Sequence, residues 1–449
     1  MRVLENRVLR LTAAATCLLA LVGCETISDF NPFSEKEKIL PGERHPLYSG
    51  ADPLAEVGDA STASPGPQAD RGDWPQSGGN AANYSGNVAF NGGGARIWKV
   101  RAGADSSSTF GSITGESLRI SSRPIVYGGN AYVYDPRGKV TAVSLGGGRG
   151  WSVSVKPEDE RDVAAGGGVA ADQGRIFVAT AYGDVVALDA GSGRQAWTVK
   201  LSGPARTAPA VADGKVFVAT QTNEVYALNQ SDGSQVWTYR GIAENAGLLQ
   251  SASPAVSGGM VVVPSTSGEI IGLTTTAGEL RWSDLVSRSY RTLAVSGLAD
   301  VSASPVIVDG TVYATGLGGR TIAVNLKTGN RVWEQDTGSA HTPVVSGDAV
   351  FMVDLDNRAV ALSRKSGKPV WVTQLPQGEK KKRNTWAGPV LAGGALWFAS
   401  NRGQLASVDA SSGKLLSTRD MSTPAYVSPI AASGRLLILG GDGSLAAFR

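Results

Sequence analysis

The chain has 449 residues, 58 of them glycine, and a formal net charge of +3 from 42 basic and 39 acidic side chains. This nearly balanced charge argues against a nucleic-acid partner, which requires a concentrated basic face. Short apolar runs bounded by Gly, Asn, Asp and Ser favour an all-β protein with many tight turns and exclude a mainly helical one.

The first 23 residues have the pattern of a lipoprotein signal peptide. Three arginines precede a short apolar stretch that ends in Leu21-Val22-Gly23-Cys24. This ending resembles the lipobox of bacterial lipoproteins, which implies cleavage before Cys24 and acylation of that residue. The alternative is an ordinary signal peptide with a chance cysteine. Because Cys17 lies in the discarded part, we expect no disulfide in the mature chain, and Glu25 in place of Asp favours the outer membrane.

Residues 24–72 have the composition of a disordered tether that follows the lipid anchor. They are rich in Pro, Ser, Gly and Asp and show no strand periodicity, so they offer little apolar surface to bury. Residues 39–44, Ile-Leu-Pro-Gly-Glu-Arg, combine apolar, turn and charged residues. This piece is either a short docking motif or plain linker.

Residues 73–449 contain a repeated unit that predicts a β-propeller. Each copy has a Gly or Asn, alternating apolar residues, a five-residue turn and a Trp, as in 183–197 and 223–237. Two more strand-like runs precede each copy, and the first run usually begins at a proline. Four short strands with a period of roughly 40 to 50 residues are typical of propeller blades. We therefore predict an eight-bladed propeller of four-stranded antiparallel blades, with seven blades as the alternative if a divergent unit is not a blade.

The strand count predicts how the ring closes. The last unit, which ends at Phe448, lacks its outer strand, whereas a lone Trp-containing strand at 95–100 lacks the three strands that normally precede it. Pairing the two would remove two open sheet edges. The regular Trp is interpreted as a docking residue between neighbouring blades rather than as part of a ligand cage. Ser417 stands where one copy should have Trp.

The repeats resemble those of pyrroloquinoline-quinone-type propellers. Together with the lipobox, the tether and the stretch Trp74-Pro75-Gln76-Ser77-Gly78-Gly79-Asn80, they are similar to the BamB family of the outer-membrane β-barrel assembly machinery. The resemblance implies a non-enzymatic scaffold lipoprotein on the periplasmic face of the outer membrane. It also implies contacts with the BamA periplasmic domains and other machinery components, with nascent outer membrane proteins as further partners.

Two long loops are the predicted partner-binding surface, at 240–253 and 284–304. The resemblance places partner contacts in these interblade loops, and Asp300 matches an acidic position of the family, whereas Ser302 replaces its second Asp. Apolar residues ringed by charges are typical of protein-binding patches. The candidates are Leu248, Leu249, Arg288, Arg291, Leu298 and Asp300. The alternative is that these leucines fold beneath their own loops.

A quinoprotein dehydrogenase on the same fold is the enzymatic alternative. Such enzymes need a quinone pocket and a calcium ion, and many carry a vicinal cysteine pair, which the mature chain lacks. The only histidines, His45 and His341, stand alone, and Asp354-Leu355-Asp356-Asn357 lacks the remaining ligands of an EF-hand and is interpreted as a turn. Gly92–Gly94 and Gly146–Gly148 do not open helices, so no phosphate site is expected. We expect no catalytic residue, metal or cofactor.

A propeller that binds cell-envelope polysaccharide is the third reading. Tyr290 and Trp386 would be its exposed aromatic residues. The basic run Lys380-Lys381-Lys382-Arg383 is interpreted as a solvated loop, with an anionic lipid or an acidic partner as the alternative.

Overall fold

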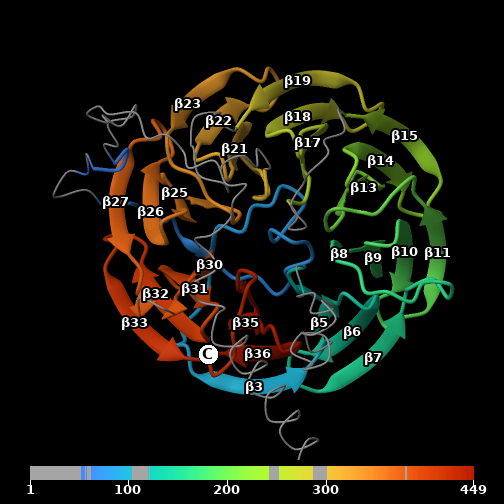
Figure 1. Cartoon of the computed structure of the whole chain (residues 1–449), viewed down its shortest axis with the longest axis horizontal. Helices are drawn as coiled ribbons and strands as arrows, with labels where there is room; N and C mark the ends of the chain where they lie inside the picture. Colours follow the sequence, from blue (N-terminus) through green and yellow to red (C-terminus); the bar gives the residue numbers. More distant parts are fainter. Residues whose placement is uncertain are drawn as a thin grey trace, which may run out of the picture. The chain divides into compact units, whose positions relative to one another are not determined.

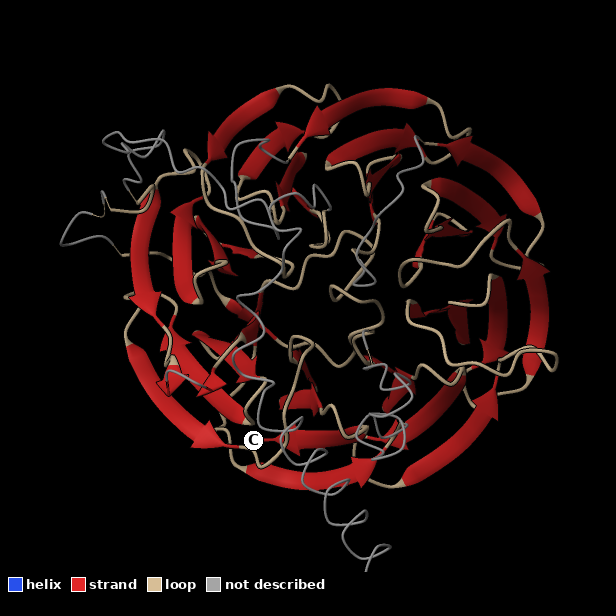
Figure 2. Cartoon of the chain, in the orientation of Figure 1, coloured by secondary structure: helices blue, strands red, loops and turns tan. Residues whose placement is uncertain are grey.

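The computed structural model describes residues 52–55, 57, 62–103, 120, 122–241, 252–286, 301–379 and 382–449. The chain divides into two units, residues 1–51 and residues 52–449, and everything described below belongs to the second. In this unit β-sheets stand around a ring (Figure 1), and the described residues form strands and loops without a helix (Figure 2). The part of the chain described therefore contains no helix that could cross a membrane.

Seven sheets have four strands each, and every pairing within them is antiparallel. From the inner to the outer strand, six of them are β4–β7 (Ile125–Tyr127, Asn130–Tyr134, Lys139–Ser144, Arg149–Ser154), β8–β11 (Gly167–Asp172, Arg175–Thr180, Asp184–Asp189, Gln195–Lys200), β12–β15 (Ala210–Ala212, Lys215–Ala219, Glu224–Asn229, Gln235–Arg240), β16–β19 (Ala255–Ser257, Met260–Pro264, Glu269–Thr274, Leu280–Leu285), β20–β23 (Val306–Val308, Thr311–Thr315, Thr321–Asn325, Arg331–Gln335) and β24–β27 (Val344–Ser346, Ala349–Val353, Arg358–Ser363, Pro369–Gln374).

The seventh four-stranded sheet joins the two ends of the propeller. It consists of β34 (Ile430–Ala432), β35 (Arg435–Leu439), β36 (Ser444–Phe448) and, at its outer edge, β3 (Arg96–Arg101). Strand β3 pairs antiparallel with β36, from Arg96 opposite Phe448 to Arg101 opposite Ser444. The lone Trp strand thus fills the position that the strand count left open, and this sheet is called the closing sheet below.

The remaining large sheet has six strands in the order β1-β2-β30-β31-β32-β33. Its members are β1 (Gln68–Ala69), β2 (Asn87–Val88), β30 (Trp386–Ala392), β31 (Ala395–Ser400), β32 (Gln404–Asp409) and β33 (Leu415–Asp420), and a separate hairpin joins β28 (Gly378–Glu379) to β29 (Lys382–Arg383). The prediction of eight four-stranded blades is therefore wrong. Seven sheets have that form, because β2 adds in parallel to the inner edge of β30 and β1 adds to β2.

The predicted tether is also wrong in part, since residues from 62 onward pack on the sheets. Residues 62–90, called the N-terminal segment below, hydrogen-bond to the inner strand, or to the turn that follows it, in every sheet of the ring. The main contacts are Pro65 O with Ser346 Oγ, Arg71 O with Ser433 N, Trp74 with Val126, Pro75 O with Ala171 N, Gln76 with Val211, Ala81 O with Val256 N, Ala82 O with Ile307 N, and Val88 O with Gly393 N.

One row of side chains explains why each repeat carries its Trp. In the sheet β8–β11, Phe177, Ala187 and Trp197 lie opposite one another on successive strands, and the two aromatic rings are 5.9 Å apart. The small residue in the middle leaves room for the rings to meet across it. The outer-strand indole then lies against the next sheet, where Trp197 Nε1 donates to Gln230 O at 3.2 Å.

The same indole contact occurs at seven boundaries between neighbouring sheets. Each Trp donates to a carbonyl in the turn between the third and fourth strands of the following sheet, as predicted for a docking residue. The donor–acceptor pairs are Trp98–Leu145, Trp151–Ala190, Trp197–Gln230, Trp237–Thr275, Trp282–Leu326, Trp333–Arg364 and Trp371–Ala410.

A glycine in each of these turns allows the indole to approach. Gly193 has a φ of +72°, and a Cβ there would lie 2.6 Å from Cε3 of Trp151. Both the left-handed backbone and the indole therefore exclude a side chain at this position. The recurrence of the turn glycine and the Trp in the sequence is thus a consequence of packing between neighbouring sheets.

Candidate functional site

The two faces of the ring differ in what covers them. Because the strands of a sheet alternate in direction, the turns between second and third strands share one face with the connections from one sheet to the next. This is the loop face. The opposite face carries the turns between first and second strands, and there the N-terminal segment makes its contacts. The connections from one described sheet to the next therefore lie on the loop face, away from these contacts of the N-terminal segment.

The residues predicted to bind a partner lie outside the described residues, as does Cys24. Leu248 and Leu249 belong to one long loop, and Arg288, Arg291, Leu298 and Asp300 belong to the other. The structure describes the stems of both loops. They flank a single sheet, β16–β19, one entering β16 and the other leaving β19. Both loops therefore leave the same part of the loop face.

The stems of both loops are fixed to the turns on that face. Gly241, which follows β15, donates its amide to Asn223 O, and the Asn223 side chain bonds Thr266 of the next sheet through both its amide nitrogen and its oxygen. On the other side, Val286 N donates to Gly268 O and Val301 N donates to Ser265 O. The turn 265–268 thus ties together the bases of both loops.

A buried arginine supports the second stem. Arg206 is 2% exposed, and its guanidinium donates to Pro264 O and to Val301 O, both at 3.4 Å. It therefore joins the end of β17 to the point where the second loop returns to the ring. Sequence reasoning missed Arg206. The signal was a lone Arg in the small-residue run 204–209, just before an inner strand.

An apolar residue surrounded by charges lies beside the second loop. Leu285, at the loop-face end of β19, is 46% exposed. Next to it, Asp284 forms an ion pair with Arg331 of the neighbouring sheet, and Arg331 also pairs with Glu334. The hydrogen bonds of Arg331 with Asp284 and Glu334 raise the pKa of Arg331, so the guanidinium keeps its charge. This is the arrangement expected at the rim of a protein-binding surface.

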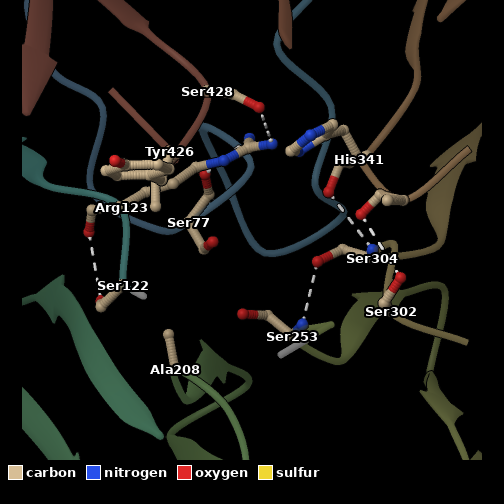
Figure 3. A pocket seen from close by; sticks show the side chains of 13 residues that line it. Ser77, Ser122, Arg123, Ala208, Ser253, Ser302, Ser304, His341, Tyr426 and Ser428 are labelled. Carbon is tan, nitrogen blue, oxygen red and sulfur yellow. Dashed lines mark hydrogen bonds between the residues drawn. The ribbon is translucent and has the colours of Figure 1, made fainter. Parts of the chain in front are cut away.

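The centre of the ring contains a small polar cavity of about 50 Å³ (Figure 3). Its wall is a series of hydroxyl residues that precede the inner strands, and it also includes Arg123 and His341. The lining residues are Ser77, Ser122, Arg123, Ala208, Ser253, Ser302, Ser304, Ala340, His341, Thr342, Tyr426, Val427 and Ser428. The hydroxyls link successive sheets, as where Ser253 N donates to Ser304 Oγ and Ser304 N to Thr342 Oγ1.

The lining of this cavity does not fit a quinone-bound calcium ion, since it contains no carboxylate. Among the described residues there is also no cluster of three His, Cys, Asp or Glu side chains that could hold a metal. Asp354 lies in the turn between β25 and β26, as predicted, and its carboxylate accepts hydrogen bonds from Arg358. Burial raises the pKa of Asp354, and Arg358 opposes that shift.

The aromatic residues proposed for sugar stacking are not available as a pair. Trp386 is 2% exposed, and its Nε1 donates to Pro376 O at 3.0 Å, so its assignment as an exposed loop residue is wrong. It was misread because the inner strand β30 begins earlier than its proline suggests. Tyr290 lies outside the described residues. Lys382 and Arg383 of the basic run form β29, and Lys380 and Lys381 lie outside the described residues.

Comparison with known proteins agrees with the fold. The family model described as "Outer membrane protein assembly factor BamB" matches residues 136–373 and 375–449. The BamB of Salmonella typhimurium is 29% identical over 328 residues, which cover 72% of this chain and 82% of that protein. The BamB of Xanthomonas campestris is 34% identical over 231 residues, which cover 50% of this chain and 56% of that protein.

Solved structures support the same fold. The crystal structure of BamB from Moraxella catarrhalis matches with a TM-score of 0.65 at 21% identity, covering 79% of this chain and 99% of that one. A europium-containing methanol dehydrogenase matches with a TM-score of 0.63 at 15% identity, covering 82% and 89%. The fold alone therefore does not separate scaffold from enzyme.

Fold and repeat together define a β-propeller built from pyrroloquinoline-quinone-like repeats. Within that class, the match of the family model over more than half of the chain decides the family. The chain belongs to the BamB family of outer membrane protein assembly factors.

Proposed function

We propose that this protein is a non-enzymatic scaffold in outer membrane protein assembly and that it binds its partners through the loop face. The observation that carries this proposal is the asymmetry of the ring. The N-terminal segment bonds to every sheet on one face, whereas two long connections leave the other face from the two sides of one sheet. Binding residues are commonly placed on loops that a rigid scaffold holds in position.

The partner we propose is the periplasmic part of BamA, with other assembly components and nascent outer membrane proteins as further partners. Family membership supports this choice, since the relatives are named as outer membrane protein assembly factors. Leu285 and the ion pairs around Arg331 extend the proposed patch beside the loop that contains Asp300. Acylation at Cys24 would hold the scaffold on the periplasmic face of the outer membrane.

The residues that line the central cavity favour a scaffold protein over a quinone-dependent dehydrogenase. A quinone cofactor with calcium needs oxygen ligands, and the cavity wall offers a guanidinium, an imidazole and hydroxyls instead. The quinoprotein neighbours share the fold at 15% identity or less. The protein is thus proposed to use the propeller as a rigid support for its loops.

The test is a double substitution in the two loops, Leu248→Ala with Asp300→Arg, followed by pull-down with the BamA periplasmic domains. We expect binding to be lost, because one variant carries both a removed apolar anchor and a reversed charge. The matched control is Leu415→Ala with Glu279→Arg, at exposed positions near the opposite face, and it should bind normally. Binding by a loop variant that melts like the parent protein would place the interface elsewhere.

A further inference from the structure

The wall of the central cavity contains a positive charge that has no ion-pair partner among the described residues, together with hydrogen-bond donors that no described residue uses. Arg123 is partly buried, and within the described chain its guanidinium makes two hydrogen bonds, from Nη2 to Ser428 Oγ at 2.8 Å and from Nη1 to Ser77 O at 3.4 Å. A guanidinium has five N–H donors. The described lining residues include no carboxylate, so the cation has no counter-ion among them.

Two further groups of the wall have polar atoms without a described partner. Ser253 is 2% exposed, and its Oγ forms no hydrogen bond with any residue that the structure describes. The His341 imidazole also lies on the wall, near the Arg123 guanidinium (Figure 3), and no hydrogen bond of its ring is found among the described residues. A buried hydroxyl without a partner costs folding free energy, which a ligand would recover.

The electrostatics of the wall favour an anion. Burial lowers the pKa of Arg123 only to about 10, so it stays protonated at neutral pH. Burial, together with the nearby Arg123 charge, lowers the pKa of His341 to about 4, so its ring is neutral there. Arg123 and Tyr426 are the other ionisable groups on this wall. The net charge on the wall is therefore positive.

We propose that the central cavity is a binding site for one oxyanion group, a phosphate or a carboxylate, held by Arg123, Ser253 and His341. A cavity of about 50 Å³ has room for about four groups of the size of a water molecule, if one water takes 10–15 Å³. Guanidinium, hydroxyl and imidazole N–H groups are the usual donors to such anions. The N-terminal segment contributes Ser77 to the wall and makes its contacts on the opposite face, so the ligand would enter from the loop face. This proposal does not depend on the assembly role.

The experiment titrates the full chain with inorganic phosphate, and separately with acetate, against chloride at constant ionic strength. Thermal stability is one readout, because a ligand of the folded state raises the melting temperature by mass action. The second is the NMR signal of His341, which is easily assigned since the chain has only two histidines. We expect saturable stabilisation, and a bound anion should raise the pKa of His341. Stabilisation by phosphate alone would identify an inorganic oxyanion, and stabilisation by both would identify a site that accepts carboxylates.

Three variants locate the site. Arg123→Gln should weaken binding by about tenfold or more, the effect of one lost charge-assisted hydrogen bond. Ser253→Ala removes only a hydroxyl without a partner, so it should fold normally and bind more weakly. Arg175→Gln is the matched control, since the Arg175 guanidinium also makes two hydrogen bonds, here to the carbonyls of Gln230 and Ser231, but lies away from the cavity, and this variant should bind like the parent protein. Equal affinity in Ser253→Ala and the parent protein, or a His341 signal unmoved by either anion, would overturn the proposal even if Arg123→Gln fails to fold.

Discussion

Seven boundaries between neighbouring sheets are held by an indole on a turn, and the boundary between the six-stranded sheet and the closing sheet is not. At the seven, a Trp of the outer strand bonds a turn that joins the third and fourth strands of the next sheet. In the closing sheet those two strands are β36 and β3, which come from opposite ends of the propeller, so no turn joins them. Ser417 stands at this boundary in place of Trp.

The closing boundary uses a different set of contacts. Ala95 and Arg449 exchange backbone hydrogen bonds of 2.8 Å where the turn would be. In the six-stranded sheet a Trp stands on β31, the strand that follows the inner strand β30, and not on the outer strand β33. Trp397 lies opposite Ser407, which lies opposite Ser417, and its ring packs edge-on against Phe90 at 5.6 Å. The difference shows that the outer-strand Trp is needed only where a continuous turn exists to receive it.

The largest effect is expected from deleting residues 95–100, which removes most of β3. The closing sheet would lose four of the five paired positions between β3 and β36 and expose the edge of β36. At roughly 1 kcal/mol for each hydrogen bond, this loss is comparable with the total stability of a domain. We expect the variant to fail to fold cooperatively, as measured by circular dichroism on heating. A synthetic peptide covering 91–103 should restore folding in trans, whereas a deletion variant that melts like the intact protein would contradict this account of ring closure.

The second prediction compares one docked boundary with the closing boundary. Trp371 is 4% exposed and donates to Ala410 O, so Trp371→Ala should cost about 3–5 kcal/mol from lost burial and packing. Trp371→Phe keeps the ring and loses the hydrogen bond, so it should cost less. Ser417→Ala, the matched position of the next sheet, should cost only about 1 kcal/mol, for its bond with Ser407. Denaturant titration of the three variants measures these costs, and equal costs at Trp371 and Ser417 would remove the distinction between the boundaries.

The repeat could be predicted from the sequence because the residues that make its contacts recur at the same positions in successive units. A turn glycine and an outer-strand Trp recur in each repeat because the Trp of one repeat packs on the turn glycine of the next, as for Trp151 and Gly193. The missing outer strand could be predicted for the same reason. Strands can be counted once the period of the repeat is known. A strand that lacks neighbours is then expected to pair with the sheet that lacks its outer strand.

The six-stranded sheet and the central cavity could not be predicted in this way. The N-terminal segment has no periodic pattern, and its contacts join residues far apart in the chain, as where Gln76 bonds Val211 and Asn83 bonds Pro305. It therefore resembles a linker in sequence. Arg123 and His341 meet only because the ring brings separate repeats to its centre. A lone Arg and a lone His carry no spacing signal, although their positions next to the prolines of the inner strands recur in the repeat.

The smallest effect is expected from Ser417→Trp, which places the consensus residue at the closing boundary. If an outer-strand Trp stabilised its own sheet without a turn to contact, Ser417→Trp would raise the free energy of unfolding by as much as Trp contributes at each of the other seven positions. Here the indole would find no turn carbonyl, because no turn joins β36 to β3, and the Ser407–Ser417 hydrogen bond would be lost. We therefore expect no gain, and a loss of up to about 1 kcal/mol in the free energy of unfolding. The reverse change at a docked boundary, Trp371→Ser, should cost several times more. A clear stabilisation by Ser417→Trp would mean that the indole acts within its own sheet, and that the turn is not what selects Trp at the other boundaries.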